Sequence, residues 1–427
     1  MLTEKSPQPI LSYLIYTCCA IAFATVPFGL KFGRDIFYVA SYISFIAIVL
    51  NLRYYTLDKL KLVVSLSFLA FGLGTTFWLI AFKQPGAYID IYRSYMSTAR
   101  LFSAMSVVSL VALNERLAMQ KITLVVSVAV GLLVNTYALY QGLWLLQSRI
   151  ELNFDRTTIV AYLLTAISLV MMQSILMLKI RYRLGFYIAA FILSYSAIIL
   201  TGTRAAMIAY PALILLTVIV TKNIITVRHK IAVILLVPVL LTSTSLVFKD
   251  LVMSRIHDFE RNIIAINDIE AENSVFSRVW MQVVAIRTGS EAPLGQSAEQ
   301  RASEAMRIIQ ADPQLYNAKR YLTVHMHNEI LETWSLKGIW GVVLLLAFYG
   351  SLTVLAFRLS RNAMLFGLTV AMIIYGLSDV IFFSTEATAT FLLAIIASIL
   401  SMKKIKLWRS NPYVNLPPVA QRYCAIF

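Results

Sequence analysis

The stretch YLTVHMHNEILETWSLKGIWG, residues 321–341, marks the point where a long polar segment of the chain returns to a hydrophobic helix. It contains His325 and His327, two of the four histidines of the chain, and Asn328 follows directly. Titratable side chains at a boundary between water and a membrane serve either as anchors or in chemistry. The rest of the sequence decides between these two roles.

The composition bounds the class of protein. Of the 427 residues, 59% are hydrophobic and 14% are charged, which is more apolar surface than a soluble core buries. We therefore expect an all-α polytopic membrane protein. The formal net charge is +16, but the basic residues lie in short clusters between apolar runs, which indicates membrane topology and argues against nucleic acid as a partner. The long polar segment contains no cysteine, so neither a disulfide framework nor a zinc site is supported.

Twelve mostly apolar runs are long enough to cross a bilayer as helices. They cover residues 10–30, 36–52, 60–82, 97–114, 122–147, 158–178, 184–201, 204–221, 230–248, 327–356, 363–382 and 387–402. We expect four regions from this pattern. They are transmembrane helices 1–9 within residues 1–248, a loop domain at 249–325, transmembrane helices 10–12 within 326–402 and a tail at 403–427.

The basic residues predict the orientation of these spans. Nineteen Lys and Arg residues lie on the side of the N-terminus. The short loops of the other side hold eight, which are Lys31, Arg34, Lys83, Arg93, Arg100, Arg149, Arg156 and Arg204. Because positive residues accumulate in cytoplasmic loops, we expect both termini in the cytoplasm and the long polar segment outside.

The polar segment should contain three helices. The first carries an apolar stripe at spacings of four and three, and we expect it to lie along the membrane surface or to cover the transmembrane bundle. Its stripe consists of Val252, Ile256, Phe259, Ile263 and Ile266. A second helix is expected from Val275 to Ile286, and a polar third from Ser297 to Gln310.

Two external arginines are candidates for binding an anion. Arg204 ends the turn TGTR (201–204), and Thr203 or Thr201 can cap the helix that follows. An anion at that helix start would satisfy both the guanidinium and the backbone amides. Arg278 lies in SRVW (277–280), and its bidentate guanidinium suits a diphosphate. The alternatives are that Arg204 reaches lipid headgroups and that Arg278 lies on a solvated helix face.

His327 is the candidate general base. A neutral imidazole accepts a proton near physiological pH, which suits the activation of a sugar hydroxyl. We expect His327 on one face of the following helix, where Gly338 and Gly341 would let another helix approach closely. His325 falls on a different helical face, which disfavours a metal pair, although an extended lead-in could bring the two rings together. A capping or interfacial histidine is the alternative.

Other polar groups give weaker signals. Buried carboxylates in lipid usually pair or line a cavity, so we rank Glu332, Asp379 and Glu386 as weak site candidates. The sequence contains no P-loop, no dinucleotide-binding glycine pattern and no HExxH motif. It therefore predicts no cofactor.

These motifs resemble those of the bacterial O-antigen ligases, within the wider group of O-antigen polymerases and O-linking oligosaccharyltransferases. The most specific match is His327-Asn328, nine residues, Gly338, two residues, Gly341, which agrees with the family pattern His-Asn-x9-Gly-x2-Gly. Arg204 and Arg278 fall where that group carries arginines. The expected spans, termini and long loop also agree, so the resemblance covers nearly the whole chain.

The resemblance implies a metal-independent glycosyltransferase of the Gram-negative inner membrane, with a fold similar to the GT-C class of lipid-sugar-dependent enzymes. Such enzymes transfer a finished polysaccharide from undecaprenyl diphosphate to the outer-core sugar of lipid A–core at the periplasmic face. In this interpretation Arg204 and Arg278 bind the donor diphosphate and His327 is the general base. The supporting residues are His325, Asn328 and Thr203.

Two other functions stay open at this point. An O-antigen polymerase or an O-linking oligosaccharyltransferase would use the same kind of donor with a different acceptor. A lipid-sugar flippase or secondary transporter belongs to another class and should carry charges and broken helices near the middle of the membrane, in paired halves. The residues favoured here lie at one edge of the spans instead.

Overall fold

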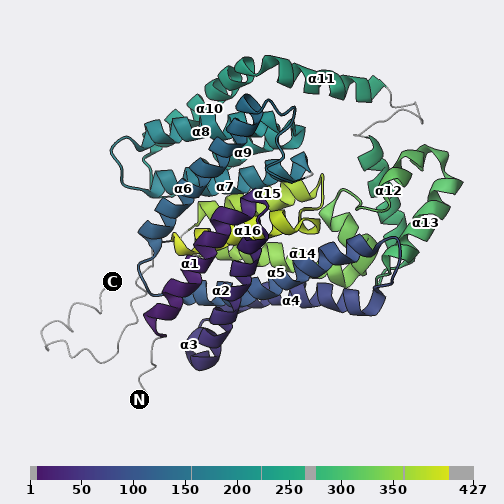
Figure 1. Ribbon diagram of the computed structural model, residues 1–427, viewed down its shortest axis with the longest axis horizontal. Helices are drawn as coiled ribbons and strands as arrows, with labels where there is room; N and C mark the ends of the chain where they lie inside the picture. The colour runs from purple at the N-terminus through teal and green to yellow at the C-terminus, as the bar shows by residue number, and fades with distance from the viewer. Residues whose placement is uncertain (1–6, 155, 223, 265–275, 359–360, 403–427) are drawn as a thin grey trace, which may run out of the picture.

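The computed structural model describes residues 7–154, 156–222, 224–264, 276–358 and 361–402 (Figure 1). Every regular element in these ranges is helical. The α-helices are α1 (Pro9–Thr25), α2 (Lys31–Leu50), α3 (Leu52–Thr56), α4 (Lys59–Phe82), α5 (Ile89–Asn114), α6 (Gln120–Leu139), α7 (Thr157–Met177), α8 (Arg183–Leu200), α9 (Arg204–Val220), α10 (Val227–Val247), α11 (Lys249–Ile264), α12 (Phe276–Glu291), α13 (Ala298–Ala311), α14 (Glu329–Arg358), α15 (Ala363–Gly376) and α16 (Thr385–Leu400). The short helical turns are η1 (Val26–Phe28), η2 (Tyr140–Trp144), η4 (Pro313–Tyr321) and η5 (Ile381–Phe383).

The all-α polytopic membrane fold is confirmed. Among the described residues, nine helices are long and apolar enough to cross a membrane, and three shorter apolar helices, α9, α15 and α16, coincide with the other predicted spans. The count of twelve spans and the likeness to the GT-C class stay predictions. The predicted span 363–382 is wrong at its end, since α15 stops at Gly376 and residues 377–380 are not helical.

Helix α7 is the centre of the bundle, and its residues from Ile159 to Leu176 are buried on all sides. An all-round apolar helix of this kind needs other helices on every face. Helices α6, α8, α9, α15 and α16 supply them. Polar side chains pair across these contacts: the Asn135 amide donates to Ser168 Oγ at 3.1 Å, and the hydroxyls of Thr165 and Tyr375 lie 2.8 Å apart. Such bonds tie apolar helices together in lipid.

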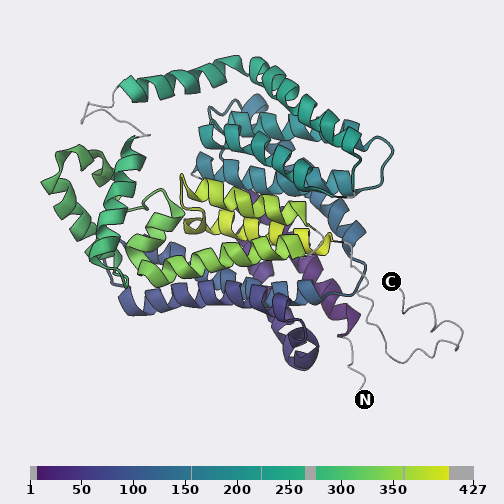
Figure 2. The same cartoon turned by 180° about the vertical axis from the view of Figure 1, so that it is seen from behind.

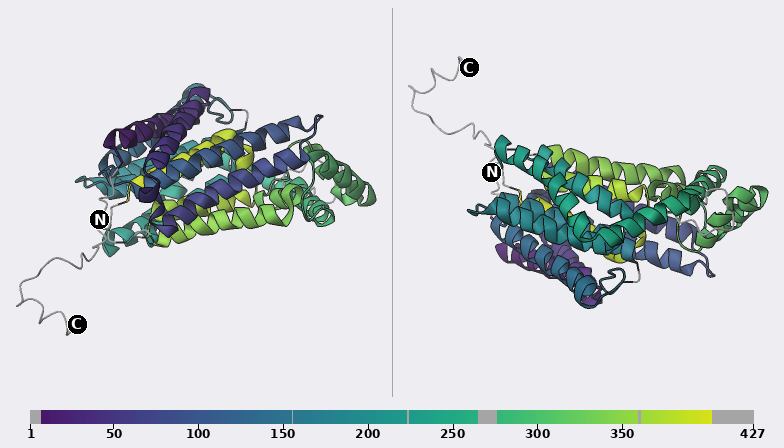
Figure 3. Two further views of the ribbon diagram at one scale, coloured as in Figure 1. Left: turned by 90° about the horizontal axis from the view of Figure 1, so that it is seen from below. Right: turned by 90° about the horizontal axis from the view of Figure 1, so that it is seen from above.

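The non-membrane helices gather at one end of the bundle. Helices α12 and α13 lie beyond the ends of α4, α5 and α14 (Figures 1 and 2). Helix α11 continues from α10 along the outside of the bundle and extends toward α12 and α13, which the views from below and above also show (Figure 3). Part of the predicted first stripe is described: Ile256, Phe259 and Ile263 are exposed on α11, whereas Ile266 lies outside the described residues.

The other two helices of the polar segment form close to their predicted positions. Ser297 starts α13 with a capping box, in which its hydroxyl accepts from Gln300 N and the Gln300 side chain accepts from Ser297 N. Helix α12 runs to Glu291, five positions beyond the predicted end at Ile286. With η4, these helices enclose a small core of their own that includes Met281, Val284, Ala305 and Met326.

Helix α14 breaks at Gly338, where φ is +67° and ψ is −161°. A Cβ at this position would lie 2.2 Å from the carbonyl oxygen of Pro293, so only glycine fits. The freed backbone groups pair with the loop before α13: Ile339 N donates to Pro293 O, and Gln296 N donates to Leu336 O, both at 2.9 Å. The close approach expected at Gly338 therefore involves a loop and not a second helix. At Gly341 the nearest atoms belong to Lys337 and Thr333 of the same helix.

Candidate active site

The two histidines lie in the turn that leads into α14. The helix begins at Glu329, and His327 adopts a left-handed conformation with φ of +48°. The expectation that His327 lies on a face of the helix is therefore wrong. Asn328 ends the turn instead, because its Oδ1 accepts from the backbone amides of Ile330 and Leu331, each at 3.1 Å. The non-helical lead-in brings the rings of His325 and His327 to 4.3 Å between centroids.

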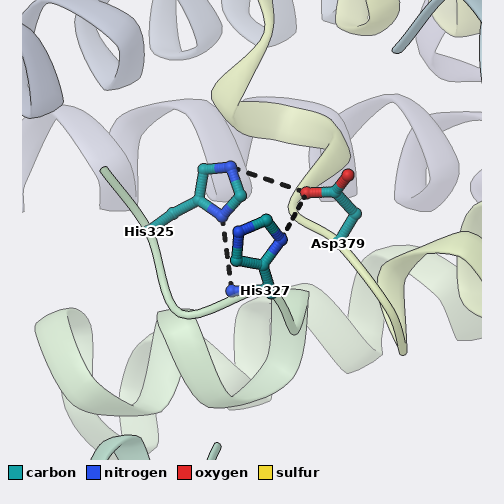
Figure 4. Close-up of side chains that lie close together, drawn as sticks. All are labelled: His325, His327 and Asp379. Atoms are coloured by element: carbon teal, nitrogen blue, oxygen red, sulfur yellow. Dashed lines mark hydrogen bonds and ion pairs between the residues drawn. The ribbon is translucent and has the colours of Figure 1, made fainter. Parts of the chain in front are cut away.

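Asp379 faces both histidines from the segment after α15 (Figure 4). Its Oδ1 lies 3.5 Å from His325 Nε2 and 3.4 Å from His327 Nδ1. The same oxygen accepts from Val380 N at 2.9 Å. Asp379 lies 52 positions after His327 and 54 positions after His325 in the sequence. We call these three residues, His325, His327 and Asp379, the His–Asp cluster.

Side chains of the α14 start hold the Asp379 segment in place. The Asn328 amide donates to Leu377 O at 3.2 Å, and the Glu329 carboxylate accepts from Phe382 N at 3.0 Å. These two bonds flank Asp379 on either side in the sequence. Asn328 therefore both caps α14 and binds the segment that carries the carboxylate opposite His327.

The surroundings of the two histidines differ and assign them different roles. His325 is buried, its Nδ1 accepts from His327 N at 3.3 Å, and its Nε2 faces Asp379, so both ring nitrogens are engaged within the protein. Burial lowers the pKa of His325 to about 4. The side chain of His327 is 15% exposed, and the contact with Asp379 uses Nδ1. The partly exposed His327, rather than the buried His325, is therefore the better candidate to face a substrate.

The His–Asp cluster also has the spacing of a metal site. One ligand atom from each residue lies within 4.8 Å of the others, and two imidazoles with a carboxylate are a common zinc donor set. The geometry is thus compatible both with a direct Asp–His contact and with a bound cation. The absence of a metal stays a prediction.

Acidification is expected to destabilise the protein through His325. Its pKa is about 4 in the folded protein, against an ordinary value of 6.5, so between these values the unfolded chain takes up a proton that the folded protein does not. The free energy of unfolding should fall as the pH drops, by about 2 kcal/mol at pH 5. Unfolding of the detergent-solubilised protein at pH 7.5 and pH 5 measures this loss. The variant His325→Gln should lose less stability on acidification than the wild type. The control His257→Gln, at an exposed histidine, should lose as much as the wild type.

Arg204 is the first residue of α9, as expected from the TGTR turn. Thr203 is the N-cap residue, but its hydroxyl makes no capping bond and instead donates to Thr157 O at 3.5 Å. Thr201 Oγ1 accepts from Thr203 N at 3.2 Å and so shapes the turn. The Arg204 guanidinium lies over the ring of Phe259 on α11, 5.8 Å from its centroid. Arg204 thus contacts α11 of the protein itself. This contact argues against the alternative that Arg204 reaches lipid headgroups alone.

Arg278 is half-buried on α12, which excludes a fully solvated helix face. It acts electrostatically on Arg204 and on the hydroxyl of Tyr162, and Asp379 acts on the same hydroxyl. The start of α7 links the two groups further, because Thr157 contacts Thr203 while Arg156 lies over the ring of Phe383, which contacts His325. The two arginines and the His–Asp cluster therefore converge on one end of the bundle.

Comparison with known proteins gives two matches. The family described as O-antigen ligase matches residues 188–346, a range that holds Arg204, Arg278, His325 and His327. The O-antigen ligase of Escherichia coli (strain K12) is 26% identical over 357 residues, which cover 82% of this chain and 84% of that protein. This chain is therefore similar to the O-antigen ligases, through a family match at residues 188–346 and a named relative along most of its length. The family resemblance read from the motifs is thus confirmed, and it identifies a multi-pass membrane transferase of lipopolysaccharide biosynthesis.

Three features of this site, in a chain similar to the O-antigen ligases, were not predicted from the sequence. Asp379 stood among the weak candidates, although an acid inside an apolar run was a signal. Glu332 pairs with Arg301 at 2.7 Å, with both side chains fully buried, and this pairing was not predicted. Arg149 and Arg255 lie beside the TGTR turn, but in the sequence they read only as a loop residue and a surface-helix residue.

Proposed function

We propose that this protein transfers O-antigen polysaccharide from an undecaprenyl diphosphate carrier to the outer-core sugar of lipid A–core. The observation that carries the proposal is the partly exposed ring of His327, whose Nδ1 lies 3.4 Å from the buried carboxylate of Asp379. The similarity to the O-antigen ligases supports lipopolysaccharide O-antigen ligation at the coarser level. The donor and acceptor named here are the finer step that needs an experiment.

In the proposed reaction His327 is the general base. The Asp379 carboxylate would hold the proton of His327 on Nδ1, and Nε2 would accept the proton of the acceptor hydroxyl when the substrate binds. The same carboxylate stabilises the imidazolium that forms. His325 orients this pair through its own contact with Asp379 and by accepting the backbone N–H of His327. His325 is thus a positioning residue.

Arg204 and Arg278 would bind the donor diphosphate. As the acceptor oxygen bonds to the anomeric carbon, the bond from that carbon to the phosphate oxygen breaks, and its electron pair stays on the diphosphate. Guanidinium groups stabilise this developing charge best when they are held in a partly buried site. Both arginines are half-buried and lie within electrostatic range of each other.

The proposed orientation follows the basic residues. The termini would lie in the cytoplasm, residues 1–248 and 326–402 would carry the inner-membrane spans, and the segment 249–325 would lie in the periplasm. The tail 403–427 lies outside the described residues. The site would then face the compartment in which both lipid-linked substrates are exposed, and the chemistry would need neither nucleotide nor metal.

Reconstituted transfer tests this function. Purified protein is mixed with undecaprenyl-diphosphate-linked polysaccharide and lipid A–core in buffer that contains EDTA, and attachment is followed by gel. We expect core-linked polymer from the wild type, and none from Arg204→Ala or Arg278→Ala. The control Arg93→Ala, at an exposed arginine, should retain transfer. Activity that EDTA removes and zinc restores would contradict the metal-free mechanism. Polymer that grows on the carrier without joining the core would identify a polymerase.

A further inference from the structure

Two arginines that the proposed mechanism does not use crowd the turn before α9. A Cβ at Gly202 would lie 3.0 Å from Arg255 Nη2 and 3.2 Å from Arg149 Nε. Gly202 also has φ of +67°, which favours glycine. Arg149 is fixed there, because its Nε donates to Thr201 O at 3.0 Å. Two guanidinium groups from the 145–156 segment and from α11 therefore share the space beside one glycine.

The charges around this turn are strongly unbalanced. Arg149 interacts electrostatically with Arg255, Arg204 and Arg278, and all four side chains are half-buried. Among the residues that the structure describes, two acids face the group. Asp258 Oδ2 lies 3.1 Å from Arg255 Nη1 but also binds Arg261, and Glu151 acts on Arg149. Burial is the main cause that lowers the pKa of Arg149, and repulsion from the charge of Arg255 is the second.

Such a juxtaposition of cations is costly unless an anion occupies it. Like charges at short range oppose each other, and partial burial weakens the screening by water. The start of α9 adds the positive end of a helix dipole at the same turn. The neighbouring acids compensate only part of this positive charge, so the arrangement favours an anion that carries more than one charge.

We infer that Arg149 and Arg255 form a second anion subsite beside Arg204, which holds the polyprenyl diphosphate after the sugar has left. The inference rests on the proposed function. Breaking the sugar–phosphate bond leaves its electron pair on the diphosphate, and the proton of the acceptor goes to His327. The leaving diphosphate is therefore more negative than the donor by one charge. Arg149 and Arg255 stabilise this additional negative charge, while Arg204 and Arg278 contact both the donor and the product.

Farnesyl diphosphate is a suitable probe of the subsite. Its binding to the purified full-length protein is measured without donor or acceptor, so the result does not depend on transfer activity. We expect the Kd to rise about tenfold or more in Arg149→Gln and in Arg255→Gln, and farnesyl monophosphate binding to change less. The control Arg93→Gln should bind as the wild type does. Arg149→Lys, which keeps the charge, should recover part of the affinity.

Two outcomes would overturn the inference. The first is an unchanged Kd for farnesyl diphosphate in Arg255→Gln, a variant on the surface of α11 that leaves the Arg149–Thr201 bond intact. The second is a loss of binding to phosphatidylglycerol vesicles without any loss of farnesyl diphosphate binding, which would make these arginines lipid anchors. Normal diphosphate binding in a protein that transfers no polysaccharide would instead count against the proposed function alone.

Discussion

Replacing His327 by alanine should lower the rate of polysaccharide transfer by about 10²–10⁴-fold, the usual contribution of a positioned general base. The substitution removes the partly exposed imidazole that the proposed reaction uses as its base. Because His327 lies outside α14 and is partly exposed, the truncation leaves the helix cap at Asn328 in place. We therefore expect the variant to insert into the membrane and to unfold at the normal temperature, while its rate of polysaccharide transfer is strongly reduced.

Asp379→Asn distinguishes a dyad from an isolated histidine. The amide keeps the size of the carboxylate but loses its charge, so we expect a smaller loss of rate than for His327→Ala. The double variant should be no slower than His327→Ala alone, since residues that act as a unit are not additive. Multiplicative losses would mean that the two residues act independently. Transfer at the wild-type rate by His327→Ala would exclude it as the base.

Replacing Arg301 by methionine should cost about 3–5 kcal/mol of stability, the usual cost of breaking a buried ion pair on one side. Arg301 Nη1 lies 2.7 Å from Glu332 Oε2, and neither side chain is exposed. Glu332 also accepts from Met326 N at 2.8 Å and from the Tyr95 hydroxyl at 3.1 Å. Without the Arg301 guanidinium, the Glu332 carboxylate stays buried, and its two remaining hydrogen bonds offset only part of the free-energy cost of its desolvation.

Two comparisons make the measurement specific. Arg307→Met removes an exposed arginine from the same helix, α13, and should change the unfolding temperature little. Arg301→Met combined with Glu332→Gln should be more stable than Arg301→Met alone, because the buried charge is gone. Because Met326 lies between the two histidines, the single variant should also lose activity. Equal unfolding temperatures for Arg301→Met and Arg307→Met would contradict the assigned role of the ion pair.

Local signals predicted the parts of this fold that depend on neighbours in sequence. The length of the apolar runs located the helices, and Ser297 with Gln300 marked the start of α13. The position of Arg204 at a helix start followed from the TGTR turn. These features depend on one helix or one turn, where spacing and capping are sufficient.

The pairings across the molecule could not be predicted in this way. His327 was wrongly assigned to a helix face, although Asn328, a favoured N-cap residue with Glu329 and Glu332 after it, was a local signal that the helix begins after His327. Asp379 meets His327 only because α15 stops at Gly376 and side chains from α14 bind the segment that follows. Arg149 and Arg255 reach Gly202 from two separate segments. Each of these contacts is set by tertiary packing.

The way the outer helices are fastened to the membrane helices limits how this enzyme can be recombined. Trp78 on α4 donates to Gln296 O, Gln296 donates to Ser335 O on α14, and Arg301 pairs with Glu332. A chimera that takes residues 249–325 from a relative would join partners that did not evolve together at all three contacts. Such a chimera should therefore be stable only when the end of α4 and the first turns of α14 are exchanged together with that segment.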